Sequence, residues 1–480
     1  MTRFDGDFTL TIDGRSVTTP TAIDVINPAT GQVIAQAPDC TSVLLDEAVA
    51  AARRAFPAWR ATPLEQRRAA VAKFAEVLAA HAQDFARLFT LEQGRPVAKA
   101  AQEIMGAAFW CQTVSQQEIP VVVNEDSAER RSETRHVPIG VVGGIVPWNF
   151  PMLLGVWKIA PALLTGNTIV IKPSPFTPLT MLKLAELMRE HLPAGVFNVV
   201  SGGDQLGPWL TAHPDVDKVS FTGSSATGRR VMESAAANLK RLTLELGGND
   251  AAIVMPDVNV EEVAEKLFWA AFGNSGQICI ATKRMYVHKD VYDAVAHALV
   301  EYARKVKVGD GLDQGTDMGP VQNKVQFDRV KNLIEDARAS GLNFLVGGDV
   351  PQADGYFVPV TIVDNPPENS RVVQEEAFGP VLPLLKFDEV DEVVARANAS
   401  EYGLAGSIWS ADVDKAVEIA SRLETGTVWI NETQYIMPWT PFGGHKQSGV
   451  GIENGSEGLL EYTLPQTISF RKSVAASAES

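Results

Sequence analysis

A cysteine and a glutamate carry the strongest chemical signal in this sequence. Cys279 lies in the run Gly276-Gln277-Ile278-Cys279-Ile280, and Glu245 lies 34 residues upstream in Leu244-Glu245-Leu246-Gly247-Gly248-Asn249. A thiol in a glycine-led loop can be a nucleophile, and a carboxylate can be the base that activates a thiol or a water. Either segment alone would say little, because most cysteines are inert small hydrophobes. The pair makes a Cys279 nucleophile served by Glu245 the first hypothesis.

Two further segments could serve such chemistry. Pro147-Trp148-Asn149-Phe150-Pro151 places an amide side chain between bulky residues, where an isolated asparagine could equally cap a turn. Phe221-Thr222-Gly223-Ser224-Ser225-Ala226-Thr227-Gly228 follows an apolar strand. Its spacing is Gly-x-x-x-x-Gly, not the Gly-x-Gly-x-x-Gly of ordinary Rossmann enzymes. Taken alone, this segment fits any strand-to-helix turn.

Together, over nearly the whole chain, these segments resemble the NAD(P)-dependent aldehyde dehydrogenase family of the hydrolytic, non-CoA-acylating type. The resemblance implies that Cys279 attacks an aldehyde carbonyl to give a thiohemiacetal. The Asn149 amide and the Cys279 backbone N–H would stabilise the oxyanion. After hydride leaves for the nicotinamide, Glu245 would deprotonate the water that hydrolyses the thioester.

Proton transfer requires further groups. Because the thiolate is the nucleophile, either the pKa of Cys279 is lowered locally or Glu245 takes its proton. Lys158 and Glu453 occupy positions that in relatives can pass the proton onward, although lysine–glutamate pairs are also common for structural reasons. For Cys40 and Cys111 we expect a buried structural role.

The resemblance also implies a dinucleotide site. Ser224 and the helix N-terminus would meet the pyrophosphate, Lys172 would bind the adenine ribose, and Glu376 and Phe378 would hold the nicotinamide ribose and ring. The full set of predicted cofactor-binding residues is Ile145, Val146, Pro147, Trp148, Lys172, Ser174, Pro175, Gly223, Ser224, Thr227, Gly228, Leu246, Gly247, Glu376 and Phe378.

One residue departs from the family pattern. NAD-preferring relatives often carry a glutamate three residues after the position of Lys172, where it binds the ribose diol and repels a 2′-phosphate. Here that residue is Pro175, and no arginine or lysine follows nearby. The sequence therefore favours NAD and leaves NADP as the alternative.

The expected substrate pocket is apolar and contains no arginine that would pair with a substrate carboxylate. We therefore expect aromatic or medium-chain aliphatic aldehydes to be better substrates than succinic semialdehyde. The predicted pocket residues are Met152, Leu153, Trp157, Ile278, Ile280, Ile436, Trp439 and Phe442.

Strands and helices alternate after residue 139, which predicts an α/β fold with a mostly parallel sheet. Residues 43–116 have helical periodicity, and the tail 472–480 has the composition of a disordered segment. The resemblance implies a Rossmann-type cofactor domain, an α/β catalytic domain and a small β arm that pairs with a neighbouring subunit in a homodimer or homotetramer. The expected ranges are 1–120 and 140–246 for the NAD(P)-binding domain, 247–440 for the catalytic domain, 121–139 and 463–480 for the arm, and 441–462 for the return to the cofactor domain.

The composition of the 480 residues excludes several classes of protein. A net charge of −16 argues against nucleic acid or an anionic membrane as partner. No uncharged apolar run reaches the length of a membrane span, and residues 1–7 lack the apolar stretch of a signal peptide. Three distant cysteines form no disulfide framework, and the seven histidines lack metal-ligand spacing. We expect a cytoplasmic protein without a metal.

Two alternatives stay open beside the hydrolytic dehydrogenase. A CoA-acylating relative would pass the thioester to CoA and typically lacks the general base, so Glu245 argues against it. A former enzyme kept as a structural protein would have lost parts of its site, yet Cys279, Glu245, Asn149, Lys172 and Glu376 are all present.

Overall fold

The first sheet is built around five parallel strands, as the alternation of strands and helices predicts. Its order is β2 (Arg15–Val17), β1 (Leu10–Ile12), β9 (Phe197–Val199), β8 (Thr168–Lys172), β7 (Val141–Ile145), β10 (Lys218–Thr222), β11 (Arg241–Glu245) and β21 (Gly449–Val450). From β9 to β11 the strands pair in parallel, and their chain order is the 3-2-1-4-5 of a Rossmann fold. Ligands bind such sheets beyond the carboxyl ends of the strands where the order reverses, here β7 and β10.

The computed structural model describes residues 4–472. The helices packed around the first sheet include four between residues 42 and 114, where helical structure was expected because apolar residues recur at helical spacing. These helices are α1 (Ser42–Ala61), α2 (Leu64–Ala80), α3 (Ala82–Gln93), α4 (Val97–Val114), α5 (Pro151–Leu164), α6 (Leu179–Met188), α7 (Leu206–Ala212), α8 (Ser225–Ala235) and α15 (Gly455–Leu460), with the 3₁₀ turn η1 (Ala236–Asn238) after α8.

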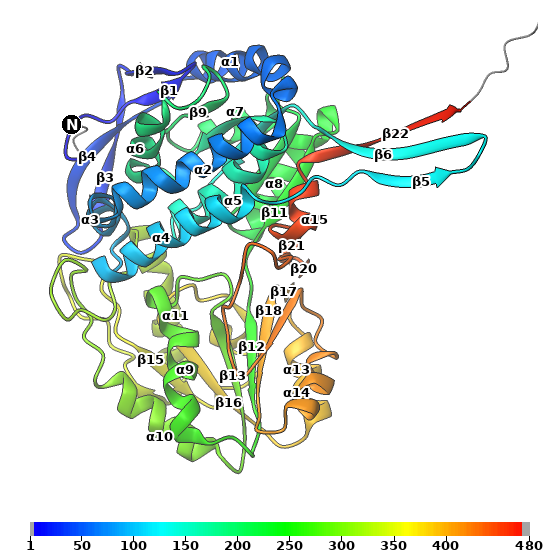
Figure 1. Ribbon diagram of the computed structural model, residues 1–480. Helices are drawn as coiled ribbons and strands as arrows, with labels where there is room; N and C mark the ends of the chain where they lie inside the picture. The colour runs from blue at the N-terminus through cyan, green and yellow to red at the C-terminus, as the bar shows by residue number, and fades with distance from the viewer. Residues whose placement is uncertain (1–3, 473–480) are drawn as a thin grey trace, which may run out of the picture.

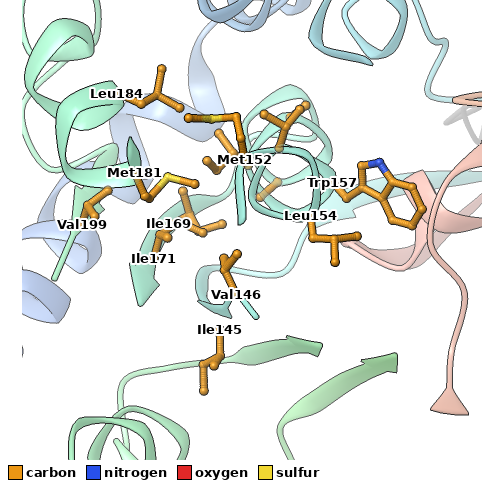
Figure 2. Packing of buried hydrophobic residues seen from close by; sticks show 14 of the residues in the cluster. Ile145, Val146, Met152, Leu154, Trp157, Ile169, Ile171, Met181, Leu184 and Val199 are labelled. Carbon is orange, nitrogen blue, oxygen red and sulfur yellow. The ribbon is translucent and has the colours of Figure 1, made fainter. Parts of the chain in front are cut away.

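Helix α5 is the most deeply buried of these helices, and it carries the site residue Lys158. Leu153 is its only residue that is not buried, because the helix is apolar on every face and is covered all round. Figure 2 shows the core beside it, where Met152, Met181 and Leu184 pack together.

The second sheet has the order β14 (Phe344–Val346), β15 (Thr361–Asp364), β16 (Val381–Phe387), β13 (Thr282–His288), β12 (Asp250–Val254), β18 (Ala405–Trp409) and β19 (Thr427–Ile430). All its pairings are parallel except that of β14 with β15. Separate hydrophobic clusters cover its two faces, because alternate residues of each strand point to opposite sides. The remaining helices are α9 (Val260–Phe272), α10 (Tyr292–Ala303), α11 (Lys324–Ala339), α12 (Arg371–Gln374), α13 (Val390–Asn398) and α14 (Val413–Ala420), with the 3₁₀ turn η2 (Gly273–Gly276).

A third sheet extends away from the rest of the molecule (Figure 1). It consists of β22 (Thr463–Arg471), β6 (Arg130–Pro138) and β5 (Val122–Asp126), paired antiparallel. The two segments expected to form the β arm therefore pair with each other within residues 4–472. Residues 473–480, expected to belong to the arm and to a disordered tail, lie outside the described residues. Two short ribbons complete the strands, β3 (Ala22–Asn27) with β4 (Gln32–Pro38) and β17 (Tyr402–Gly403) with β20 (His445–Lys446).

Candidate active site

Cys279 follows a strained loop that leads from α9 to β13. Within the turn η2, Asn274 and Ser275 have left-handed φ values of +49° and +58°. Gly276 follows at φ +72°, and a Cβ there would lie 2.2 Å from the carbonyl oxygen of Gly379. Only glycine fits this position. Gly276 therefore allows the cysteine loop to pack closely on the backbone of Gly379.

Asn149 lies across from this loop, immediately before α5. Its side chain is 4% exposed, and its Nδ2 donates to the carbonyl oxygen of Gln277 at 3.0 Å. An amide nitrogen carries two hydrogens, so this bond leaves a second N–H of Asn149 available as a donor. Asn149 and Cys279 border one cavity.

A buried ion pair between Arg95 and Glu103 supports the backbone of Asn149. Arg95 donates to the Asn149 carbonyl oxygen at 2.6 Å and to the Asn274 side chain at 3.0 Å. It also pairs with Glu103 at 2.5 Å, and Glu103 accepts the first backbone N–H groups of α5, from Met152 and Leu153. Sequence reasoning missed Arg95, Glu103 and Asn274, because no motif marks contacts between residues so far apart in the chain.

Glu245 ends β11 and is almost fully buried, at 4% exposure. Neither carboxylate oxygen has a hydrogen-bond partner among the described residues. Burial raises the pKa of Glu245 well above its usual value, the charge of Glu453 raises it further, and Lys158 opposes the rise. A carboxylate with a raised pKa and no fixed partner has the properties of a general base.

The Cys279 thiol is not acidified by its surroundings. Burial raises its pKa to about 12, while Lys283 lowers it and Glu245, Asp250 and Glu376 raise it. A locally lowered pKa, one of the two routes considered from the sequence, does not fit these surroundings, because the loss of hydration outweighs the attraction of Lys283. Of the two routes to a thiolate, the structure favours proton transfer to a base.

Lys158 and Glu453 form a pair that is 1% exposed on each side, with 3.0 Å between Nζ and Oε1. Lys158 also donates to the hydroxyls of Ser220 at 3.1 Å and Thr222 at 2.9 Å. Both members of the pair affect the pKa of Glu245, so the pair lies within electrostatic reach of that carboxylate.

A cavity of about 140 Å³ opens beyond the carboxyl ends of β7 and β10, where the Rossmann topology places a ligand. Eight of the predicted cofactor residues border it, together with Asn149, Cys279, Thr222, Gln326 and Arg329; the eight are Pro147, Trp148, Gly223, Ser224, Leu246, Gly247, Glu376 and Phe378. Trp148 and Phe378 meet edge to face across it, with ring centroids 5.3 Å apart.

Several features of this cavity fit a dinucleotide. A Cβ on Gly247 would lie 2.5 Å from the Glu376 carboxylate, so only glycine leaves that space open. Ser224 caps α8 by accepting from the Thr227 N–H, and Gly228 follows in the same turn. Lys172 ends β8 at 6% exposure, and within residues 4–472 its ammonium makes a single hydrogen bond, a long one of 3.3 Å to the Pro173 carbonyl. Burial lowers the pKa of Lys172 to about 8, with Asp204 opposing, so the ammonium lacks the acceptors that sugar hydroxyls would supply.

The remaining predicted cofactor residues follow β7 and β8. Ile145 and Val146 lie at the end of β7, beside the core shown in Figure 2, and the Val146 N–H donates to the Lys172 carbonyl. Ser174 is buried and accepts from the Phe176 N–H, and Pro175 is half-buried.

Helix α11 holds the far wall of the cavity, which the sequence did not reveal. Gln326 donates to the carbonyl oxygens of Ala377 and Phe378, each at 3.0 Å, and Arg329 donates to that of Glu376 at 3.0 Å. Phe378 has φ +47°, an unfavourable conformation for a residue with a side chain. The two side chains of α11 hold it in place.

A second cavity of about 400 Å³ lies on the other side of the cysteine loop. Of the predicted pocket residues, Leu153 and Ile278 border it. Phe150, Trp269, Met318 and Gln434 add to its lining, and Lys99 and Asp317 lie at exposed positions around it.

The other six predicted pocket residues do not border this cavity. Met152 is fully buried and belongs to the core, because α5 is covered on every side. Ile280 and Phe442 are also core residues, and Ile436 packs against the same core without bordering the cavity. Trp157 stacks on Trp110, whereas Trp439 is 58% exposed and contacts Phe109.

Two absences concern only residues 4–472. No helix there is long and apolar enough to cross a membrane. No cluster of three or more histidine, cysteine, aspartate or glutamate side chains is arranged to hold a metal ion in that range.

Comparison with known proteins agrees with this geometry. The chain is 46% identical over 462 residues to a probable aldehyde dehydrogenase from Pseudomonas sp., covering 96% of this chain and 94% of that protein. It is 41% identical to a phenylacetaldehyde dehydrogenase from Pseudomonas fluorescens, covering 93% and 92%. An aldehyde dehydrogenase from Bacillus cereus, solved with NAD+, superimposes with a TM-score of 0.96 at 37% identity and covers 98% of each chain. An NADP-dependent enzyme from E. coli superimposes with a TM-score of 0.94 at 37% identity, covering 96% and 98%.

The sequence model of the Aldehyde dehydrogenase family matches residues 15–468, nearly the whole chain. Together with the fold and the identities above, this match shows that the chain belongs to the aldehyde dehydrogenase family, whose members oxidise aldehydes.

Proposed function

We propose that this enzyme converts an aldehyde to the carboxylic acid through a covalent adduct on Cys279, with Glu245 as the general base. The observation that carries the proposal is the position of the cysteine loop. Cys279 borders the cavity at the Rossmann switch point, while its neighbour Ile278 borders the larger cavity on the other side. A thiol between two such spaces can meet a carbonyl from one side and present its adduct to a hydride acceptor on the other.

The first step needs a thiolate. Because the Cys279 thiol has a raised pKa, Glu245 takes the proton as Sγ attacks the carbonyl carbon, and a thiohemiacetal forms. The second N–H of the Asn149 amide and the Cys279 backbone N–H donate to the developing oxyanion. The nicotinamide, when bound, accepts the hydride that leaves the former aldehyde carbon.

The thioester left on Cys279 is then hydrolysed. Glu245 passes on the first proton and takes another from water, whose oxygen attacks the acyl carbon as the carbon–sulfur bond breaks. The unpaired oxygens of Glu245 support this role, since no hydrogen bond has to break before the carboxylate turns. Lys158 and Glu453 receive the proton that Glu245 must lose.

We propose NAD as the preferred cofactor, with NADP also used. Pro175 supplies no carboxylate that would repel a 2′-phosphate, which keeps discrimination weak. Relatives of both kinds support both cofactors: the Bacillus cereus enzyme binds NAD+, and the E. coli enzyme is NADP-dependent.

Replacing Pro175 by glutamate should therefore impair NADP use more than NAD use. A new like charge beside the 2′-phosphate should shift the ratio of kcat/KM values at least several-fold, since about 1 kcal/mol corresponds to a fivefold change. Steady-state kinetics with both cofactors measure this ratio, and Pro175→Gln is the uncharged control. Equal losses with both cofactors would show that residue 175 does not face the 2′ position.

For the substrate we propose an apolar aldehyde, aromatic or of medium chain length. Phe150, Leu153, Trp269, Ile278 and Met318 give the larger cavity apolar walls. Its one arginine, Arg95, is already paired with Glu103 and cannot serve a substrate carboxylate. The likeness to a phenylacetaldehyde dehydrogenase agrees with this substrate class.

We also propose that the β arm joins subunits into a homodimer or homotetramer in the cytoplasm. Val122, Val123, Ile468 and Phe470 expose apolar surface on the two outer strands of the arm. Such a surface on an edge strand favours pairing with a second chain. The three free cysteines fit a reducing compartment.

The deciding experiment incubates the enzyme with a panel of aldehydes and either cofactor while reduced nicotinamide is recorded. We expect turnover with phenylacetaldehyde-like and aliphatic aldehydes to exceed that with succinic semialdehyde, and no turnover for Cys279→Ala. A requirement for CoA would instead support the acylating alternative, and a Cys279→Ala enzyme that still turns over would refute the covalent mechanism.

A further inference from the structure

A row of polar side chains runs along one face of the first sheet, inside an otherwise apolar core. Lys218, Ser220 and Thr222 alternate along β10 and therefore point to the same side. In register beside Ser220 and Thr222 lie Thr243 and Glu245 of β11. Lys218, Ser220 and Thr243 are all 0% exposed. The row thus begins at the general base and continues toward the opposite end of the strands.

The inner part of this row is the pair already described. Glu453 Oε1 accepts from Lys158 at 3.0 Å and from the Ser220 hydroxyl at 3.2 Å. These contacts carry the row from the neighbourhood of Glu245 to the middle of β10.

The outer part reaches solvent. Lys218 Nζ donates to the Thr243 hydroxyl at 2.6 Å, and that hydroxyl donates to Glu461 Oε2 at 3.5 Å. Lys218 Nζ itself lies 3.8 Å from Glu461 Oε2. The side chain of Glu461 is 33% exposed, so it is the point at which the row meets water.

Tyr462 lies between the two parts. Lys218 Nζ is 4.9 Å from the centre of its ring, and its hydroxyl is buried without a hydrogen-bond partner among the described residues. Burial raises the pKa of Tyr462, Glu453 raises it further, and the Ser220 hydroxyl lowers it. The unpaired phenol is therefore close to the inner part as well as to Lys218.

We propose that Lys218 and Glu461 form the outer half of a proton route. The route removes the proton from Glu245 after this carboxylate has deprotonated Cys279 and before it deprotonates water. The inference rests on the proposed function, in which Glu245 first takes the Cys279 proton and later a water proton. The same carboxylate cannot hold both, so one proton must leave in between. It passes from Glu245 to the Lys158–Glu453 pair and on to Lys218 and Glu461, and so to water. Between the pair and Lys218 lies the Tyr462 hydroxyl, which has no fixed partner within residues 4–472.

The charges around Lys218 suit this role better than a structural one. Burial lowers the pKa of Lys218 to about 8, with Glu461 and Glu453 raising it and Lys158 lowering it. Such an amine gains and loses a proton near neutral pH. A lysine needed only to fill space would be replaced by methionine without kinetic effect, because the two side chains have similar length and volume.

The test compares Lys218→Met, Glu461→Gln and wild type in the full-length enzyme. Stopped flow measures the first turnover of reduced nicotinamide and the steady state that follows, in H₂O and D₂O and across pH. We expect an unchanged first turnover for Lys218→Met. Its steady state should slow roughly tenfold, which is less than the about 10²–10⁴-fold typical of losing a direct general base, and its solvent isotope effect should be larger. Glu461→Gln should show the same pattern at smaller size.

Lys183→Met is the matched control, since Lys183 is a buried lysine that pairs with the partly exposed Glu186 on α6, outside the row. Its steady-state rate and its thermal stability should both match those of wild type. Wild-type steady-state rates and isotope effects in Lys218→Met would overturn the proposal, and Glu461→Gln decides in the same way if Lys218→Met does not fold. Failure of the wild-type enzyme to reduce the cofactor would instead refute the proposed function, so the two failures are distinguishable.

Discussion

The two sides of Cys279 are built on opposite principles. On the Asn149 side a network of hydrogen bonds supports the donor: Arg95 bonds to Glu103, Asn274 and the Asn149 carbonyl, and Glu103 also accepts two backbone N–H groups. On the other side the Glu245 carboxylate is equally buried, yet neither of its oxygens is bonded.

The difference matches what each side must do. An oxyanion donor acts best when it is fixed before the reaction, because no reorganisation is then needed as charge develops. A base that serves first the thiol and then water must turn, and a hydrogen-bonded carboxylate would resist that. The hydrogen bonds that stabilise the fold therefore surround the oxyanion donor, whereas the buried, unbonded base costs stability. Functional residues are where enzymes usually carry such a cost.

The largest effect should come from the unbonded side. Glu245→Gln keeps the shape but removes the base, so steady-state turnover should fall by about 10²–10⁴-fold. Because an uncharged amide is cheaper to bury than a carboxylate, the variant should unfold at the same or a higher temperature than wild type. Rapid mixing should show one equivalent of reduced nicotinamide per site, formed more slowly than in wild type because the Cys279 thiolate must form unaided. Still slower turnover should follow, with acylated Cys279 visible by intact mass. Undiminished turnover would remove Glu245 from the mechanism.

Asn149→Ala tests the fixed side. Loss of one oxyanion donor should reduce kcat by about 10²–10³-fold. The first turnover and the steady state should slow together, because the oxyanion forms before the hydride leaves. In contrast to Glu245→Gln, a higher pH should not restore the first turnover. A normal first turnover in this variant would show that Asn149 does not face the oxyanion.

The sequence predicted these two sides unequally, for a physical reason. Cys279, Glu245 and Asn149 each lie in a contiguous segment whose neighbours are constrained with them, so a local pattern reveals them. Arg95, Glu103 and Gln326 act through contacts between elements distant in the chain, and no local pattern records such contacts.

The fold and the pocket show the same limit. The mostly parallel sheets were predicted from the alternation of strands and helices, because a helix between two strands allows them to pair in parallel; the order of the strands was not predicted. The pocket did not follow: Met152 and Leu153 are adjacent apolar residues, and only the packing around α5 decides that the first is core and the second borders the cavity.

Removing the ion pair that supports Asn149 should lower the stability of the fold more than it lowers turnover. Arg95→Met leaves Glu103 buried without its cation, and breaking a buried pair in this way typically costs about 3–5 kcal/mol. We expect the lower end of that range, because Glu103 keeps two backbone donors. Chemical denaturation measures the loss, and turnover should fall by less than in Asn149→Ala. A double variant, Arg95→Met with Glu103→Leu, removes both charges and should recover part of the stability; no recovery would mean that the unpaired charge was not the cause.

The smallest effect, and the one that most sharpens the contrast, is the pH dependence of the first turnover. In wild type, the rate should rise as pH passes through the raised pKa of Glu245 and then level off, because a deprotonated Glu245 can take the thiol proton at any higher pH. In Glu245→Gln the thiolate must form unaided. Burial is the largest cause of the raised Cys279 pKa and persists when the Glu245 charge, a smaller cause, is removed. Below the Cys279 pKa the thiolate fraction grows about tenfold per pH unit, so the first turnover of the variant should keep rising at pH values where that of wild type has levelled off. Stopped flow at fixed ionic strength measures both profiles. A flat profile in Glu245→Gln would mean that another group activates Cys279, and the role of Glu245 would then be limited to hydrolysis.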